Sequence, residues 1–360
     1  TTTNVENLTV SAGTGAVNFG GNIGSTTALR SVTISGATIT LPAGVTTTAD
    51  QSYTGAVTLV SNTILTTTTN GNILFPTTAS TINATTAGVQ SLSVNANGTG
   101  TIRYSGDIGT MKALSSISST GGLTHFPAAI TTTGIQSYTG PVKLVYNATL
   151  NTTNSNVSFV GATSIIDATT NGAQSLTVNA GAATITYGGE IGISEFQPTP
   201  RPIPPVITYY ALSSLTSTGA VIRALDVKTT GNQAYTGTTT LNGNYTTTTG
   251  TFDVTGNTIL AGGTSVDTSA GNQNITLGGT VTGAANTLDL SAGTGAVSIT
   301  GAASGLASLT ANGATVDVLG VASTGNQAYT GTTTLNGNYT TTTGTFDVTG
   351  NTILAGGTSV

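Results

Sequence analysis

Cysteine is absent from this 360-residue chain, which excludes disulfide bonds and thiolate metal sites. Tryptophan is also absent, and histidine and methionine occur once each. Charged residues make up 5 % of the chain, against about 25 % in an ordinary soluble domain. No apolar run approaches the roughly 18 residues that a membrane-spanning helix needs. The composition therefore excludes a disulfide-framed fold and predicts no membrane insertion of this segment.

The few charges are unevenly distributed. All seven Lys and Arg residues lie before residue 229, whereas residues 229–360 contain five Asp and no cation. Binding to phosphates needs clustered Lys or Arg, so nucleic acid is excluded as a partner. Glu/Lys-rich stretches with i,i+4 spacing are missing as well, and the sequence predicts no helix.

Threonine and glycine dominate what is present, with 83 and 49 residues respectively. Steady recurrence of Val, Ile, Leu, Tyr and Phe, together with a small net charge, argues against a disordered chain. β-branched residues favour strands, and frequent Gly and Asn favour the turns between them. The sequence therefore predicts an all-β fold.

A 37-residue passage occurs twice without a single difference, at residues 230–266 and 324–360. Its core is an older motif, Gln-Ser/Ala-Tyr-Thr-Gly. That motif occurs at residues 51–55, 136–140, 233–237 and 327–331. The spacings between the four motifs define modules of about 85–97 residues. An internal repeat of this kind indicates a repeat architecture.

Each module divides at its turn signals into units of about 20 residues, which is typical of a β-solenoid built from stacked coils. The odd positions of "QSYTGAVTL" are predicted to face the core, namely Gln51, Tyr53, Gly55, Val57 and Leu59. Thr239 and Thr333 replace Val57 in the copied passage, so the core is expected to accept Thr there. An inward Gln is expected to bond to its equivalent in the next coil or to a turn backbone.

One insertion interrupts the repeats, and it sets the expected organisation. Solenoid coils are predicted for residues 1–192 and 211–360, with a Pro-rich loop extruded at 193–210 that holds five of the nine prolines. A tolerated loop insertion is one interpretation. A contact element is the other, with four residues offered as possible contacts. These residues are Phe196, Arg201, Tyr209 and Tyr210.

Candidate chemistry is sparse, and we predict no catalytic, cofactor-binding or metal site. His125 is the single histidine, and other modules place Arg223 and Asp317 at nearly the same point, so the position accepts varied polar groups. Lyases and glycosidases need grouped carboxylates, but the twelve acids are dispersed along the chain. Asp267 is a weak candidate for calcium because such sites want several acids. We expect no enzyme.

A family resemblance adds to this interpretation. Residues 8–29, "LTVSAGTGAVNFGGNIGSTTAL", and residues 46–59, "TTTADQSYTGAVTL", resemble the repeats of filamentous-haemagglutinin-type bacterial adhesins. The resemblance extends through the chain except residues 193–210. It implies a right-handed parallel β-helix, secretion across an outer membrane, and a role in adhesion, aggregation or biofilm. Those repeats carry no catalytic residues to transfer.

The expected function is that of a non-enzymatic, extracellular segment of a bacterial surface fibre, acting as a rigid stalk. The chain starts without Met and stops in mid-repeat, so we expect an excerpt of a longer protein. Alternatives are a subunit of a self-assembling filament, sheath or coat, and an ice-binding solenoid with ranked threonines. Expected partners are like fibres, or a ligand on a host, cell surface or matrix.

Overall fold

The computed structural model describes residues 6–193 and 210–360, and within them it contains strands but no helix. These strands form parallel β-solenoid turns, about 16 in total with about 21 residues each. The all-β and solenoid predictions are confirmed. In the same residues, no helix is long and apolar enough to cross a membrane.

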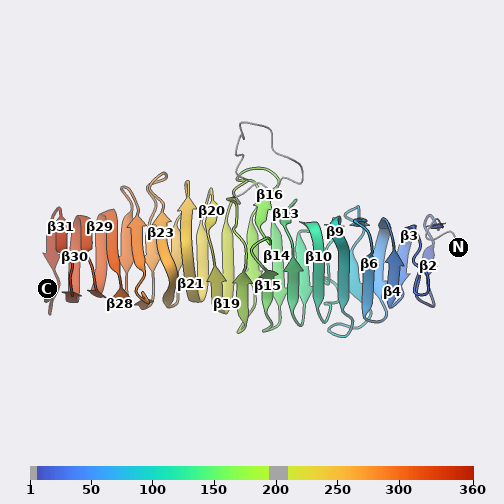
Figure 1. The fold of residues 1–360 in the computed structure, drawn as a ribbon, viewed down its shortest axis with the longest axis horizontal. Helices are drawn as coiled ribbons and strands as arrows, with labels where there is room; N and C mark the ends of the chain where they lie inside the picture. Colours follow the sequence, from blue (N-terminus) through green and yellow to red (C-terminus); the bar gives the residue numbers. More distant parts are fainter. Residues whose placement is uncertain (1–5, 194–209) are drawn as a thin grey trace. The chain divides into compact units, whose positions relative to one another are not determined.

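The described chain divides into two compact units. Figure 1 draws the strands of both, coloured along the sequence from blue at the N-terminus to red at the C-terminus. Unit 1 comprises residues 6–169 and 174–189, and unit 2 comprises residues 170–173, 190–193 and 210–360. The strands of unit 1 are β1 (Asn7–Ser11), β2 (Ala16–Asn18), β3 (Ser31–Leu41), β4 (Gly44–Thr47), β5 (Gln51–Leu59), β6 (Thr63–Thr67), β7 (Ile73–Phe75), β8 (Ile82–Ala84), β9 (Leu92–Tyr104), β10 (Ile117–Phe126), β11 (Ala129–Thr132), β12 (Gln136–Thr139), β13 (Val142–Leu144), β14 (Ala148–Thr152), β15 (Val157–Val160), β16 (Ile166–Ala168), β17 (Leu176–Asn179) and β18 (Thr184–Tyr187). The strands of unit 2 are β19 (Leu215–Ala224), β20 (Val227–Thr229), β21 (Gln233–Thr247), β22 (Phe252–Val254), β23 (Thr258–Asp267), β24 (Ile275–Leu277), β25 (Val281–Thr282), β26 (Thr287–Ser291), β27 (Ala296–Ile299), β28 (Ala303–Leu306), β29 (Ser308–Ser323), β30 (Gln327–Thr341), β31 (Phe346–Thr349) and β32 (Thr352–Leu354).

Parallel pairing arranges the strands of unit 1 in three faces, which the chain visits in the order A, B, C. Face A stacks the first part of β5 on β7, then the last parts of β9 and β10, then β13 and β16. Face B includes the last part of β5, β8, β11, β14 and β17. Face C includes β4, β6, the first parts of β9 and β10, β12, β15 and β18.

Unit 2 has the same construction, with faces D, E and F in chain order. Face D begins with the first parts of β19 and β21 and continues through β22, β24 and β27. It ends with the middle parts of β29 and β30. Face E includes the second parts of β19 and β21, the first part of β23, and then β25 and β28. Face F includes β20, β26, the first parts of β29 and β30, and β31.

Alternation of residue types explains these strands. In β5 every second side chain, from Gln51 to Leu59, is buried, and those between are half-buried. The inward set predicted from the sequence is therefore confirmed. Thr239 and Thr333 are both fully buried, as expected for positions that replace Val57. Each inward side chain packs on the residue one coil away, which buries apolar area that a single coil cannot bury.

Aromatic residues stack inside face A of unit 1. The rings of Tyr53 and Phe75 lie 5.2 Å apart between centroids, and those of Phe75 and Tyr104 lie 5.6 Å apart. Both pairs are stacked, and all three side chains are almost fully buried. Such contacts between aromatic rings add to the stabilisation from burial, so they tie consecutive coils together.

The sequence module and the coil are out of phase. Gln51 lies on face A, whereas Gln136, the same position one module later, lies on face C. In unit 2, Gln233 lies on face D and Gln327 lies on face F. In both units, the face that carries the later motif is the one that the chain visits just before the face of the earlier motif. The two modules of one unit therefore present their outward residues on different faces.

The copied passage carries most of its own stacking partners. Gln233 pairs with Phe252 of the same passage, and Gln327 pairs with Phe346 of the second copy. The ring geometry repeats as well. The centroids of the Tyr235 and Phe252 rings lie 5.6 Å apart, and the matching pair in the second copy lies 5.5 Å apart. One sequence thus folds in the same way on two different faces.

Candidate functional site

The residues predicted as a contact element fall mostly outside the described part of the chain. Phe196, Arg201 and Tyr209 lie among residues 194–209, which the structure does not describe. Tyr210 is described and is half-buried. The prediction that these four residues form a contact loop stays a prediction.

The motif Gln-Ser/Ala-Tyr-Thr-Gly builds a buried polar corner. Nε2 of Gln51 donates to the carbonyl oxygens of Val45 at 3.3 Å and of Thr66 at 2.8 Å, and it contacts Oγ1 of Thr47 at 3.2 Å. The phenol of Tyr53 donates to Oε1 of Gln51 at 2.8 Å. One amide thus joins three segments of backbone and satisfies its own buried atoms.

This corner recurs at the other three motifs. Nε2 of Gln136, Gln233 and Gln327 donates to a carbonyl oxygen one coil further on at 2.9, 2.9 and 2.8 Å. The matching phenols donate to the Gln oxygen at 2.9, 3.1 and 3.0 Å. Neither of the two partners predicted for an inward Gln, its equivalent or a turn backbone, is the one found, because the acceptors are carbonyl oxygens of neighbouring strands. The residue that pairs with Gln51 in the next coil is Ile73, so glutamines do not stack on each other there.

Asparagine side chains connect the turns of neighbouring coils. Oδ1 of Asn72 accepts the backbone N–H of Thr101 at 2.9 Å, and Oδ1 of Asn232 accepts that of Thr251 at 3.0 Å. In the second copy of the passage, Oδ1 of Asn326 accepts the backbone N–H of Thr345 at 3.1 Å. At these points the ladder has just opened into a turn, and the Asn oxygen takes the place of a backbone acceptor.

Ionisable side chains gather in one column on the outer side of face A, called the charged column below. Arg103, His125, Lys143 and Asp167 occupy the same register position on β9, β10, β13 and β16. Adjacent strands lie about 4.8 Å apart, so each member faces the next at close range. In the sequence, each of these residues stands between two inward apolar or small residues of a strand, and this pattern predicts that its side chain faces outward. Their alignment follows from the coil register.

His125 is uncharged in this column at neutral pH. Burial lowers the pKa of its imidazole, and the positive charges of Arg103 and Lys143 on either side lower it further. Its Nδ1 atom is buried and has no hydrogen-bond partner among the described residues. Asp167, beyond Lys143, is 1 % exposed. This arrangement contains no base that orients the imidazole for catalysis.

A pocket of about 550 Å³ lies along the corner between faces C and A of unit 1. Glycines form its floor, because any side chain there would meet the previous coil. A Cβ atom on Gly140 would lie 2.0 Å from the carbonyl oxygen of Gly121. Asn, Thr, Pro and Ile line the rest of the pocket, and no charged residue does. The hollow is therefore a by-product of the turn.

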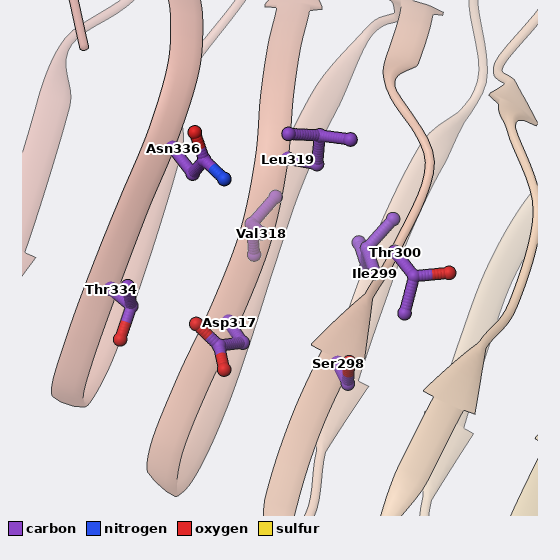
Figure 2. Close-up of a pocket in the computed structure, with 8 residues that line it drawn as sticks. All are labelled: Ser298, Ile299, Thr300, Asp317, Val318, Leu319, Thr334 and Asn336. Atoms are coloured by element: carbon purple, nitrogen blue, oxygen red, sulfur yellow. The ribbon is translucent and has the colours of Figure 1, made fainter. Parts of the chain in front are cut away.

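A second pocket, of about 260 Å³, contains the carboxylate of Asp317. It lies on the outer side of face D, across β27, β29 and β30. Figure 2 shows Asp317 between Ser298 and Thr334. Leu319 lies further along β29, the strand of Asp317, and Asn336 lies further along β30, the strand of Thr334. The register aligns Ser298, Asp317 and Thr334 on consecutive coils. Among the pocket residues, Asp317 is the one with a charged side chain.

Metal chemistry finds little support in the residues that the structure describes, where no group of three or more His, Cys, Asp or Glu could hold an ion. Oδ1 of Asp267 accepts the backbone N–H of Ser269 at 2.9 Å and so closes a local turn. No protein-family model, curated protein or solved structure matches this chain. Its interpretation as a β-helix repeat protein rests on the fold itself.

Proposed function

We propose that this chain is a rigid, non-enzymatic segment of an extracellular fibre of the filamentous-haemagglutinin-like adhesin type, located on a bacterial cell surface. The adhesin-like repeats described above support the surface location and the role in adhesion, aggregation or biofilm. In this function the solenoid supplies length and stiffness, and contact with other surfaces is made through its outer side chains or through neighbouring parts of the fibre.

The coupling between coils carries the proposal. At each motif, the Gln and the Tyr, with a Thr or Ser four residues before the Gln, join backbone segments inside the core. The distances from the Gln amide to the carbonyl oxygen of the next coil repeat across the four motifs. Asn bridges and stacked rings connect the same coils a second and a third time. The four motif glutamines, together with buried serines such as Ser80 and Ser164, thus use their side chains to bond between coils. That use suits a stalk, whose work is to transmit force without unwinding.

The offset between module and coil favours a separate fibre over a sheath or coat. Lateral packing into a layer requires the same contact on one side at regular intervals. Here each motif lies on a different face from the previous motif of its unit. An ice-binding surface also needs one constant face. On face C, four consecutive coils place Ser93, Ser118, Ser137 and Ser158 at one outward position. At the other they place Asn95, Thr120, Thr139 and Val160, so neither position forms a continuous rank of threonine.

Immuno-electron microscopy of intact producing cells tests the proposal, with an antibody raised against the copied 37-residue passage. We expect label along thin, separate fibres that extend from the cell. Pre-absorbing the antibody with the 37-residue peptide should remove the label. A continuous ordered layer of label would make this a coat protein, and label confined to the cell interior would reject the extracellular location.

A further inference from the structure

We infer that the Asp317 pocket binds a neutral sugar unit of a polysaccharide. This inference rests on the proposed function, because it names the ligand class that such a fibre would contact. The pocket is formed by Ser298, Asp317, Thr334, Leu319 and Asn336 from three neighbouring coils of unit 2.

The polar groups of the pocket are open to a ligand. In the described part of the chain, the side chains of Ser298, Asp317, Thr334 and Asn336 have no hydrogen-bond partner in the protein. The neighbouring Thr300 differs, since its hydroxyl donates to the carbonyl oxygen of Gly278 at 2.6 Å. Four adjacent side chains thus offer a carboxylate acceptor, an amide that donates and accepts, and two hydroxyls.

This set matches the hydroxyl groups of a sugar ring. Two neighbouring hydroxyls donate to the two oxygens of one carboxylate, and an amide donates to a third oxygen. Leu319 lies further along β29 from Asp317 and beside Asn336 of β30 in Figure 2, and it is 37 % exposed. Its side chain offers an apolar surface to the C–H face of the ring. The volume of about 260 Å³ is that of a small site rather than of a groove for a folded partner.

Other ligand classes fit less well. Residues 229–360 contain no Lys, Arg or His, so an anionic ligand would meet Asp317 without any compensating charge. A calcium ion takes six to eight oxygen ligands and usually several carboxylates. This pocket has one carboxylate, and no cluster suited to a metal occurs among the described residues. A neutral ligand rich in hydroxyl groups satisfies every open group.

The copied passage provides an internal control. Thr334 and Asn336 belong to the second copy, and their equivalents in the first copy are Thr240 and Asn242. Thr240 pairs with Arg223 in the preceding coil, whereas Thr334 pairs with Asp317. The same residues therefore lie beside a cation in one copy and beside a carboxylate in the other. Only the second copy should bind a neutral sugar through a carboxylate.

Saturation-transfer difference NMR on the 360-residue chain tests the inference. The probes are the methyl α-glycosides of glucose, mannose and galactose, with glucuronate and glucosamine as charged comparisons. We expect transfer to at least one neutral glycoside at millimolar concentration, little change between low salt and 0.5 M NaCl, and none to glucuronate. D317A and N336A should each weaken binding at least tenfold, and N242A should leave it unchanged.

Several outcomes would overturn the inference. These are absence of transfer to all three neutral glycosides, equal binding by D317A, or binding of glucosamine alone that salt abolishes. Thermal melting of each variant separates loss of the site from loss of the fold, and D317N offers a second variant that keeps the shape of the side chain. Because this assay uses purified protein, its failure would leave the cell-surface labelling experiment unaffected, and the reverse also holds.

Discussion

The phenol of Tyr53 donates a hydrogen bond to Oε1 of Gln51 at 2.8 Å, and neither side chain is exposed to solvent. Burial raises the pKa of Tyr53 well above its ordinary value, so the phenol stays protonated and acts as a donor. With Oε1 occupied, Nε2 of Gln51 is directed toward the carbonyl oxygens of Val45 and Thr66. Tyr53 therefore fixes the orientation of the amide that joins the coils.

Replacing Tyr53 by Phe should destabilise the surrounding coils by about 1–3 kcal/mol, because the Gln51 oxygen loses its partner while remaining buried. Hydrogen exchange of the amides in β5 and β7 measures the local free energy of opening, which suits a repeat protein better than a single global transition. Tyr146→Phe is the matched control, since Tyr146 is 38 % exposed. Equal protection in both variants would show that the phenol contributes nothing.

The glycine that ends the same motif should tolerate no side chain. Gly55 has φ of 136°, and a Cβ atom there would lie 1.9 Å from the carbonyl oxygen of Gly36 in the preceding coil. Gly55→Ala would therefore require the backbone to move and the coils to separate. We expect loss of exchange protection across β3 and β5, and a lower melting temperature. Gly21→Ala, where no atom lies within 4 Å, should have little effect, and equal effects would contradict this account.

The sequence allowed the solenoid and its inward residues to be predicted because each depends on a local pattern. Alternation in β5 fixes which side chains are buried, and the turn residues fix the coil length. That Gln51 bonds to backbone was predictable as well, since a buried amide must find hydrogen-bond partners, but its acceptors lie in strands β4 and β6 rather than in a turn.

The outer surface was not predictable in the same way. Arg103 and His125 are 22 residues apart, but Arg103 and the position it faces in the preceding coil, Leu74, are 29 apart. Because turn lengths vary between coils, spacing in the sequence does not reveal which outward residues align. The charged column and the Asp317 pocket both arise from such alignment. For the same reason the change of face between the two modules of one unit could not be derived from module length.

The charged column should make stability depend on pH. The pKa of His125 is lower in the folded protein than the value near 6.5 of an unfolded chain. As the pH falls below 6.5, the unfolded state takes up a proton first, so stability decreases toward acid until the folded pKa is passed. The groups facing His125 are Arg103 and Lys143, with Asp167 beyond Lys143.

Chemical denaturation at pH 7.5 and pH 5 should show this loss, and His125→Asn should reduce it. Lys143→Met should raise the imidazole pKa, because one of the two repelling charges is removed. NMR titration of the single His125 Cε1–H signal measures that pKa directly. A pKa at or above 6.5 in the unaltered protein would refute the assignment, and an unchanged value in Lys143→Met would exclude repulsion by Lys143 as a cause.

Identical residues of the two copies should respond differently to the same substitution. Leu260 is 1 % exposed, because β25 and β26 pair with the strand that contains it, whereas the equivalent Leu354 is 69 % exposed. Leu260→Ala should therefore destabilise unit 2 by about 2–5 kcal/mol, the usual range for truncating a buried Leu. Leu354→Ala should change stability by about 0.5 kcal/mol or less. Chemical denaturation of both variants of the 360-residue chain measures the two losses of stability. Because the two 37-residue copies are identical, the local sequence around the substituted Leu is the same in both. Equal losses would mean that Leu354 is covered in solution by a second copy of the chain, and the dependence of the Leu354→Ala effect on protein concentration would then identify that contact.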